Sequence, residues 1–128
     1  MLLVGIDLVE NKRIQKSISN PRFLRRILGT SEYSQLEMRG FPVQSVAASF
    51  CAKEAFSKAL GTGIRGFLLS EVELLRKSSG EPYLCLSGGA QRIAESRGII
   101  FHVSVTHTKE YASAVVIGEE KNNEGIKL

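Results

Sequence analysis

Residues 46–60 constrain the fold most, because they form the longest clear helical pattern in the chain. Small and apolar side chains recur on one side of this pattern and polar side chains on the other, with Phe50 as an exception. The apolar set is Ala52, Ala55, Phe56, Ala59 and Leu60, and the polar set is Ser49, Lys53, Glu54, Ser57 and Lys58. Gly61-Thr62-Gly63 ends the helix, since glycine accepts the left-handed backbone common just past a helix C-terminus. We therefore expect a long amphipathic helix.

Strand patterns lie near both ends of the chain. Residues 2–8 are apolar apart from Gly5 and Asp7, and the H-V-S-V-T-H segment at 102–107 alternates between two faces. Residues 111–117 form its expected antiparallel partner. Further strands are expected at 71–76 and 82–86, and further helices at 21–28, from about 30 to 40, and at 90–97. This order predicts one α+β domain at residues 1–118, with helices packed on a mainly antiparallel sheet, and a flexible tail at 119–128.

Composition limits the classes of protein to which the chain can belong. Its 128 residues, 43% hydrophobic and 23% charged, match an ordinary globular domain. Because no apolar run approaches the roughly 20 residues that span a bilayer, and the N-terminus is unlike a secretory signal, we expect a cytoplasmic protein without a membrane segment. Cys51 and Cys85 form no C-x-x-C motif, which favours buried free thiols. The net charge of +4 suits an anionic partner without identifying it.

Three charged side chains are candidates for chemistry. Asp7 lies in an apolar strand, where a carboxylate needs a positive partner unless it faces water at the strand end. Glu54 and Lys58 lie four residues apart, which suits an ordinary helical ion pair worth roughly 0.2–0.5 kcal/mol. In the functional alternative, Asp7 and Glu54 converge on Mg²⁺, which usually takes one or two protein carboxylates together with water and phosphate oxygens. Lys58 would then lie beside those phosphates.

Three segments are more specific than any of these residues alone. They are G-I-D-L-V-E at 5–10, F-C-A-K-E-A-F-S-K-A-L-G-T-G at 50–63 and H-V-S-V-T-H-T-K-E-Y-A at 102–112. In order and spacing they resemble the short, bacterial class of phosphopantetheinyl transferases, over residues 1–118. The resemblance implies an enzyme of fatty acid biosynthesis that transfers 4′-phosphopantetheine from coenzyme A to a serine of apo-acyl carrier protein. It also implies dependence on Mg²⁺ and release of adenosine 3′,5′-bisphosphate.

The resemblance further implies roles for individual residues. These are Asp7 and Glu54 as Mg²⁺ ligands, Lys58 and Gly61 beside the phosphates of coenzyme A, and Thr106 and His107 as contributors from the C-terminal strand. A homotrimer is implied as well, in which the carboxylates and His107 that serve one site come from different chains. The base that takes the serine proton stays open between Asp7, Glu54 and a water on the metal.

Arginines near the N-terminus form a candidate surface for the carrier protein. On the helix at 21–28, Arg22, Arg25 and Arg26 share one face, and Arg13 precedes them in the chain. The carrier of this pathway is expected to be acidic and helical, and guanidinium groups bind carboxylates in a planar, two-pronged way. The alternative is a basic face that serves only solubility.

Two positions depart from the family pattern, and two other functions compete with it. Ser49 stands where similar sequences often carry arginine, and Glu81 stands where a basic residue is common before the proline of S-G-E-P-Y. Both changes remove positive charge near an expected polyanion. A nucleic-acid-binding protein is disfavoured because the few aromatic residues are not interleaved with basic ones. A Mg²⁺-dependent nucleotide hydrolase would use the same carboxylates.

Overall fold

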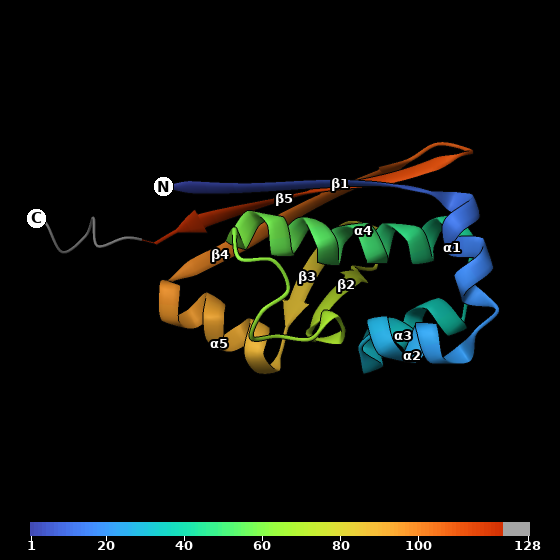
Figure 1. Cartoon of the computed structure of the whole chain (residues 1–128), viewed down its shortest axis with the longest axis horizontal. Coiled ribbons are helices and arrows are strands. Elements are labelled where there is room, and N and C mark those ends of the chain that lie inside the picture. Colours follow the sequence, from blue (N-terminus) through green and yellow to red (C-terminus); the bar gives the residue numbers. More distant parts are fainter. Residues whose placement is uncertain (122–128) are drawn as a thin grey trace, which may run out of the picture.

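Helix α4 (Val43–Leu60) runs through the centre of the computed structural model, which describes residues 1–121 (Figure 1). It begins three residues before the predicted 46–60 and ends, as predicted, at Gly61 in a left-handed conformation. The other elements, in chain order, are β1 (Leu2–Glu10), α1 (Asn11–Ile18), α2 (Pro21–Ile27), α3 (Thr30–Glu37), a 3₁₀ turn η1 (Leu69–Glu71), β2 (Val72–Arg76), β3 (Pro82–Leu86), α5 (Gly88–Arg97), β4 (Ile99–His107) and β5 (Tyr111–Glu120).

Two antiparallel sheets lie on either side of α4. The larger has the strand order β1-β5-β4, and the smaller pairs β2 with β3. α4 packs on all three strands of the larger sheet and also on β2 of the smaller one. Helices α2, α3 and α5 lie on the same side of α4 as the smaller sheet (Figure 1). The predicted α+β class is therefore confirmed, with the strands divided between two sheets.

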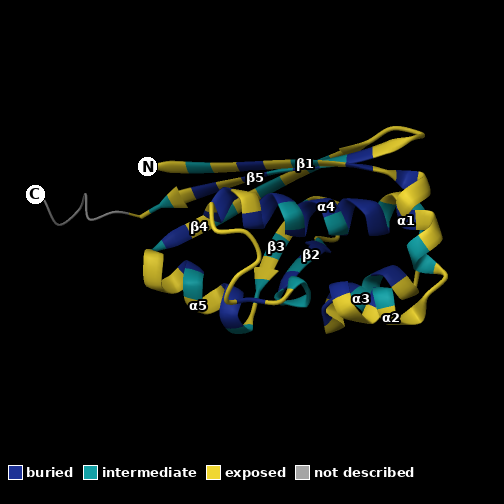
Figure 2. Cartoon of the chain, viewed as in Figure 1, coloured by how far each residue is buried: buried dark blue, intermediate teal, exposed yellow. Residues whose placement is uncertain are grey.

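The predicted polar side of α4 is wrong for three of its residues. Ser49, Lys53 and Ser57 are only 2%, 0% and 5% exposed, so α4 is buried along most of its length (Figure 2). The reason is the second sheet, which covers the side of the helix that a single-layer fold would leave in water. Burial lowers the pKa of Lys53, and the Glu32 carboxylate opposes this effect, because Lys53 Nζ donates to Glu32 Oε1 at 2.7 Å and also to the Val72 carbonyl.

Gly5 sets the distance between β1 and α4. A Cβ atom at this position would lie 1.9 Å from the Ala55 carbonyl oxygen and 2.6 Å from the Ala59 backbone nitrogen. Only glycine therefore allows the strand to approach the helix so closely. Because side chains alternate along a strand, Asp7 faces α4 on the same side of β1 as Gly5.

Most of the remaining predicted elements are confirmed, and their end signals act as expected. The Asn20 side chain accepts a hydrogen bond from the Arg22 backbone nitrogen at 3.0 Å, which caps α2. Gly98 ends α5 in a left-handed conformation. Helix α1, which follows β1 directly, was not predicted.

The structure also bears on three smaller expectations. Cys51 is buried as predicted, but the same prediction is wrong for Cys85, which is exposed on β3. Residues 119 and 120 of the expected tail belong to β5, and residues 122–128 of that tail lie outside the described residues. Within residues 1–121, no helix is both long enough and apolar enough to cross a membrane.

Candidate active site

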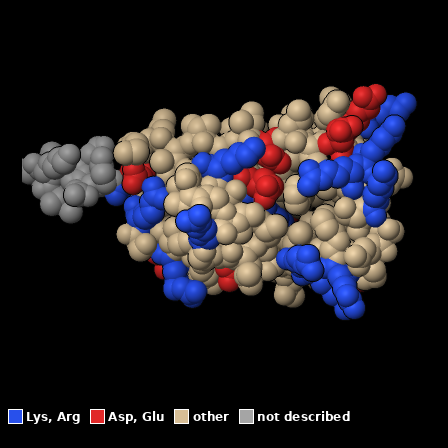
Figure 3. Space-filling model, in the orientation of Figure 1, with Lys and Arg blue, Asp and Glu red and all other residues tan. Residues whose placement is uncertain are grey.

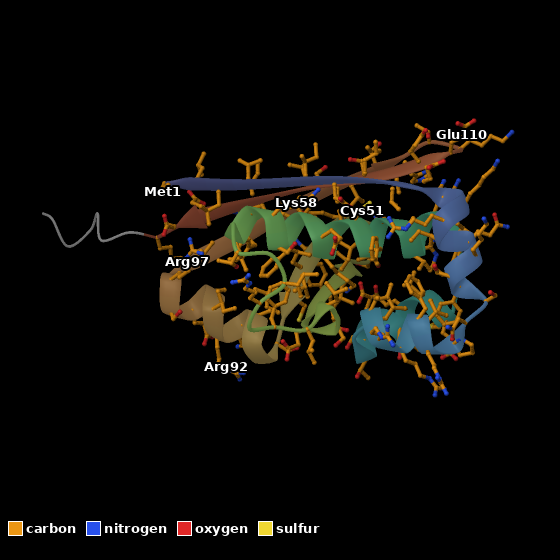
Figure 4. The ribbon with its side chains drawn as sticks, in the orientation of Figure 1. Met1, Cys51, Lys58, Arg92, Arg97 and Glu110 are labelled. Carbon is orange, nitrogen blue, oxygen red and sulfur yellow. The ribbon has the colours of Figure 1, made fainter. Side chains whose placement is uncertain are left out.

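Asp7 meets Lys58 between the middle of β1 and the last turns of α4. Its Oδ1 accepts a hydrogen bond from Lys58 Nζ at 3.0 Å, and the same Nζ donates to the Ile6 carbonyl at 3.1 Å. The Asp7 side chain is 14% exposed, whereas that of Lys58, which is labelled on α4 in Figure 4, is 54% exposed. The pair therefore opens to solvent through the lysine. The expectation that Asp7 needs a positive partner is confirmed.

Glu54 completes a cluster of two carboxylates and one ammonium group. Partial burial raises the pKa of Glu54 and the negative charge of Asp7 raises it further, while Lys58 and Arg13 lower it in part. The two carboxylates therefore repel one another across the space between β1 and α4. Among the described residues, Lys58 forms its ion pair with Asp7 and not with Glu54, so the expected pair within the helix is replaced by a contact between elements.

The Cys51 side chain of α4 lies next to this cluster and interacts with Asp7. Its thiol donates to the Ala112 carbonyl at 3.4 Å, which ties α4 to the central strand of the larger sheet. Burial, followed by the charge of Asp7, raises the pKa of Cys51 to about 12. The thiol therefore stays protonated at neutral pH and adds no third negative charge to the site.

The donor set of this cluster fits Mg²⁺. Within residues 1–121, no group of three or more His, Cys, Asp and Glu side chains is placed to hold a metal ion. Two carboxylates are nevertheless the number that Mg²⁺ usually takes from a protein when phosphate oxygens and water supply the rest. A divalent cation between Asp7 and Glu54 would also relieve the repulsion that raises the pKa of Glu54.

Gly61 lies one turn beyond Lys58, at the exposed end of α4. Its backbone nitrogen donates to the Lys58 carbonyl at 3.1 Å, and its φ of 79° is left-handed. A Cβ atom there would meet nothing within 4 Å, so backbone conformation and not space favours glycine at this position. The open backbone leaves room for a ligand that extends from Lys58.

Thr106 and His107 lie away from the carboxylates, at the end of edge strand β4. The register pairs His107 with Ala112 of β5 and pairs Asp7 of β1 with Ala114, so the central strand separates the two edges. Alternation along β4 directs His107 toward the α4 side of the sheet and Thr106 toward the opposite side. One chain therefore does not bring these two residues together with Asp7 and Glu54.

His107 instead lines a cavity of about 560 Å³ beside α3 and the first half of α4. Ser49 and Gly80, which precedes Glu81, line the same cavity, so the two departures from the family pattern fall in or beside it. The cavity also contains Arg39 and Arg76, which the sequence analysis did not identify. Neither arginine belongs to a motif, and only the loop geometry between α3 and α4 and between β2 and β3 brings them together.

The predicted carrier-binding arginines lie on α1 and α2. Arg22, Arg25 and Arg26 are exposed, while Leu24 and Ile27 of the same helix are buried, as predicted. Arg13 stacks over the ring of Phe50, with its guanidinium carbon 5.6 Å from the ring centroid. Basic side chains gather over this end of the molecule (Figure 3). Because Arg13 also acts on the pKa of Glu54, the basic surface reaches the carboxylate cluster.

Comparisons with known proteins agree with the observed fold. A family profile described as the 4′-phosphopantetheinyl transferase superfamily matches residues 3–116. A protein of Thermoanaerobacter sp. (strain X514) named holo-[acyl-carrier-protein] synthase is 40% identical over 126 residues, covering 95% of this chain and 91% of the relative. The crystal structure of holo-[acyl-carrier-protein] synthase from Neisseria meningitidis has a TM-score of 0.85 and 31% identity, covering 92% of this chain and 98% of that one.

A second solved structure was obtained with a ligand. It is a holo-(acyl-carrier-protein) synthase from Bacillus anthracis in complex with CoA (3′,5′-ADP), and its TM-score is 0.76 at 34% identity. The match covers 93% of this chain and 96% of that one.

Proposed function

The chain belongs to the 4′-phosphopantetheinyl transferase superfamily, and from this premise we propose that it transfers 4′-phosphopantetheine from coenzyme A to a serine of apo-acyl carrier protein. The observation on which the proposal rests is the convergence of Asp7, Glu54 and Lys58 from β1 and α4. Two carboxylates and one ammonium group form a site for a cation and a phosphate together. The Bacillus anthracis relative, whose structure is in complex with CoA (3′,5′-ADP), supports coenzyme A as the donor.

Asp7 and Glu54 would hold Mg²⁺ in this reaction. When bound, Mg²⁺ supplies positive charge that stabilises the pyrophosphate of coenzyme A as its bridging bond breaks. Lys58 supplies a second positive charge, since its side chain is more than half exposed and can turn from Asp7 toward a phosphate. The exposed Gly61 backbone lies about one turn beyond Lys58, at the C-terminal end of α4.

The proposed reaction is a substitution at phosphorus. The serine Oγ of the carrier forms a bond to the phosphorus that bears the pantetheine arm. The bond from this phosphorus to the bridging oxygen breaks, and adenosine 3′,5′-bisphosphate leaves with the electron pair. Asp7 and Glu54 are the carboxylates of the cluster, and either can accept the serine proton.

We also propose that the active sites are shared between chains of a homotrimer. About 10 Å, or two strand spacings, separates the β1 edge from the β4 edge, so His107 cannot serve the Asp7 cluster of its own chain without a large movement. The outer face of β1 is unusually apolar, because Leu2, Val4, Ile6 and Leu8 are 61–65% exposed. A continuous apolar face of this kind is typical of a subunit interface.

Mass spectrometry of an acyl carrier protein tests the proposed function. The protein, coenzyme A and Mg²⁺ are incubated with apo-carrier, and the carrier should gain the mass of one phosphopantetheine group on its serine. A carrier whose acceptor serine is replaced by alanine serves as the control and should gain nothing. Addition of EDTA should stop the transfer.

The same incubation separates the competing functions. A nucleotide hydrolase would release adenosine 3′,5′-bisphosphate from coenzyme A without any carrier, whereas the transferase releases it in proportion to the modified carrier. Release without carrier modification would overturn the proposal.

A further inference from the structure

Asn11, the first residue of α1, holds the backbone of the β4–β5 hairpin. Its Nδ2 donates to the Thr108 carbonyl at 3.3 Å and to the Lys109 carbonyl at 3.1 Å. Its backbone nitrogen donates to the Glu110 carbonyl at 2.8 Å. Glu110, labelled in Figure 4, lies at the end of the molecule that also carries α1. One residue of α1 therefore binds three consecutive carbonyls of the hairpin.

The amide of Asn11 fits its surroundings in only one orientation. The residue is 7% exposed, and Asn11 Oδ1 is buried without a hydrogen-bond partner among residues 1–121. A reversed amide would place this oxygen against the carbonyls of Thr108 and Lys109, which are acceptors as well. A buried acceptor that lacks a donor costs stability. The side chain is therefore placed for its two N–H donors, although its oxygen is left unsatisfied.

The hairpin that Asn11 holds follows His107, the last residue of β4. His107 is exposed and lines the cavity beside α4, so its place depends on the backbone around it. The pairing of β1 with β5 ends where Glu10 meets Tyr111, so residues 108–110 extend past the third strand of the sheet. A two-stranded hairpin without further packing is only marginally stable. The contacts with Asn11 supply that packing directly beside His107.

We propose that Asn11 is a positioning residue for coenzyme A, which acts by fixing the hairpin and thereby the imidazole of His107 at the cavity. The inference rests on the proposed function, in which His107 contributes to the coenzyme A site. The alternative is a role of Asn11 in α1 alone. The two roles predict different behaviour of the same variant.

Asn11→Asp separates the two roles. The variant keeps the size of the side chain but replaces both N–H donors by oxygen, which repels the carbonyls of Thr108 and Lys109. A carboxylate in the first turn favours the helix itself, and α1 has none there. We expect Asn11→Asp to weaken coenzyme A binding about 10-fold by calorimetry, the scale of one lost hydrogen bond to a charged group. Unchanged binding would overturn the proposal.

The effect of Asn11→Asp should also depend on His107. In the His107→Ala background it should weaken coenzyme A binding by less than about 2-fold further, because residues that act through one another are not additive. Two losses that simply multiply would leave Asn11 a merely structural role. Normal coenzyme A binding by His107→Ala alone would equally refute the inference, since there would be no contact to position.

Histidine NMR gives a readout that needs no ligand. The chain has two histidines, and His102, on the opposite face of β4, is an internal reference. In Asn11→Asp the imidazole resonances of His107 should shift or broaden, while those of His102 stay in place. Asn20→Ala removes the asparagine cap of α2 and is the matched control, which should leave both histidines and the coenzyme A affinity unchanged. Movement of both histidines in Asn11→Asp, or of neither, would contradict the positioning role.

Asn11→Ala keeps the proposal testable if Asn11→Asp does not fold. Residues 108–110 are exposed, so water can replace the lost donors, and the variant should show the same His107 shift with a smaller loss of affinity. Normal coenzyme A binding by the Asn11 variants, with transfer by the wild type intact, would overturn the inference alone. A wild-type protein that neither binds coenzyme A nor modifies a carrier would overturn the proposed function as well.

Discussion

Asp7 experiences two charges with opposite effects, the ammonium of Lys58 at 3.0 Å and the carboxylate of Glu54. The lysine forms an ion pair with the aspartate, whereas burial and the charge of Asp7 both raise the pKa of Glu54. Such a position costs stability and is typical of a residue retained for function.

Removal of either carboxylate should abolish most transfer. We expect Asp7→Asn and Glu54→Gln each to lower kcat/KM about 100-fold or more, the scale of losing one electrostatic contact to a transition state. Glu110→Gln, at the exposed β4–β5 hairpin, is the matched control and should retain the wild-type rate (Figure 4). Near-normal rates in both site variants at limiting Mg²⁺ would contradict the metal assignment.

Glu54→Gln should also stabilise the metal-free protein at neutral pH. The folded-state pKa of Glu54 is raised above its ordinary value of 4.5, so the cost of ionising it is absent below pH 4.5 and develops as the pH rises through the folded-state pKa. The variant should therefore have the higher free energy of unfolding at pH 7 in EDTA, and the difference should vanish below pH 4.5. Urea unfolding over this range measures it, and a variant less stable than the wild type at pH 7 would contradict the electrostatic account.

At the scale of elements, the buried Lys53–Glu32 pair joins three of them. Glu32 of α3 accepts from Lys53 of α4, and it also accepts from the backbone nitrogens of Gly29 at 3.1 Å and Leu74 of β2 at 3.0 Å. Both side chains of the ion pair are fully buried. The pair therefore fixes the side of α4 that lies opposite the Asp7 cluster.

Lys53→Met should destabilise the fold because it leaves Glu32 buried without its counter-charge. We expect a loss of about 3–5 kcal/mol in the free energy of unfolding, with partial recovery when Glu32→Gln is added. Lys77→Met, which removes a lysine of a solvent-exposed ion pair, should cost about 1 kcal/mol or less. A loss for Lys53→Met no larger than for Lys77→Met would contradict this role.

Helix α2 presents a separate prediction, for the carrier protein. Reversal of Arg22 and Arg26 to glutamate should raise the apparent KM for carrier and flatten its salt dependence, because exposed opposite charges chiefly increase the association rate. The coenzyme A affinity should stay nearly unchanged, since these side chains lie on α2, away from Lys58 and Gly61 at the C-terminal end of α4 (Figure 1). Lys77→Glu is a control for a general charge effect. An equal loss of coenzyme A affinity would assign these arginines to the nucleotide site.

At the scale of the whole molecule, periodicity predicted most elements but not how they cover one another. α1 was missed because Ile14 and Ile18 are the only apolar residues in its eight. Burial of Lys53 was missed because an amphipathic pattern assumes one covering layer, whereas α4 has two. Asp7, Glu54 and Lys58 were identified from motifs, but the pairing of Lys58 with Asp7 depends on the close approach at Gly5. Spacing within one helix cannot reveal a contact between elements.

The opposite positions of Asp7 and His107 make subunit mixing a direct test of shared sites. Asp7→Ala and His107→Ala should each inactivate the protein alone, since every site then lacks one group. After unfolding and refolding together in equal amounts, random trimers should contain about one quarter of sites with both groups intact, because each site takes them from neighbouring chains. Transfer activity should therefore return to a corresponding fraction of the wild type, with analytical ultracentrifugation to establish the trimer. Val4→Asp, on the exposed apolar face of β1, should prevent assembly and recovery together. If proven mixed trimers show no recovery, Asp7 and His107 do not meet across an interface.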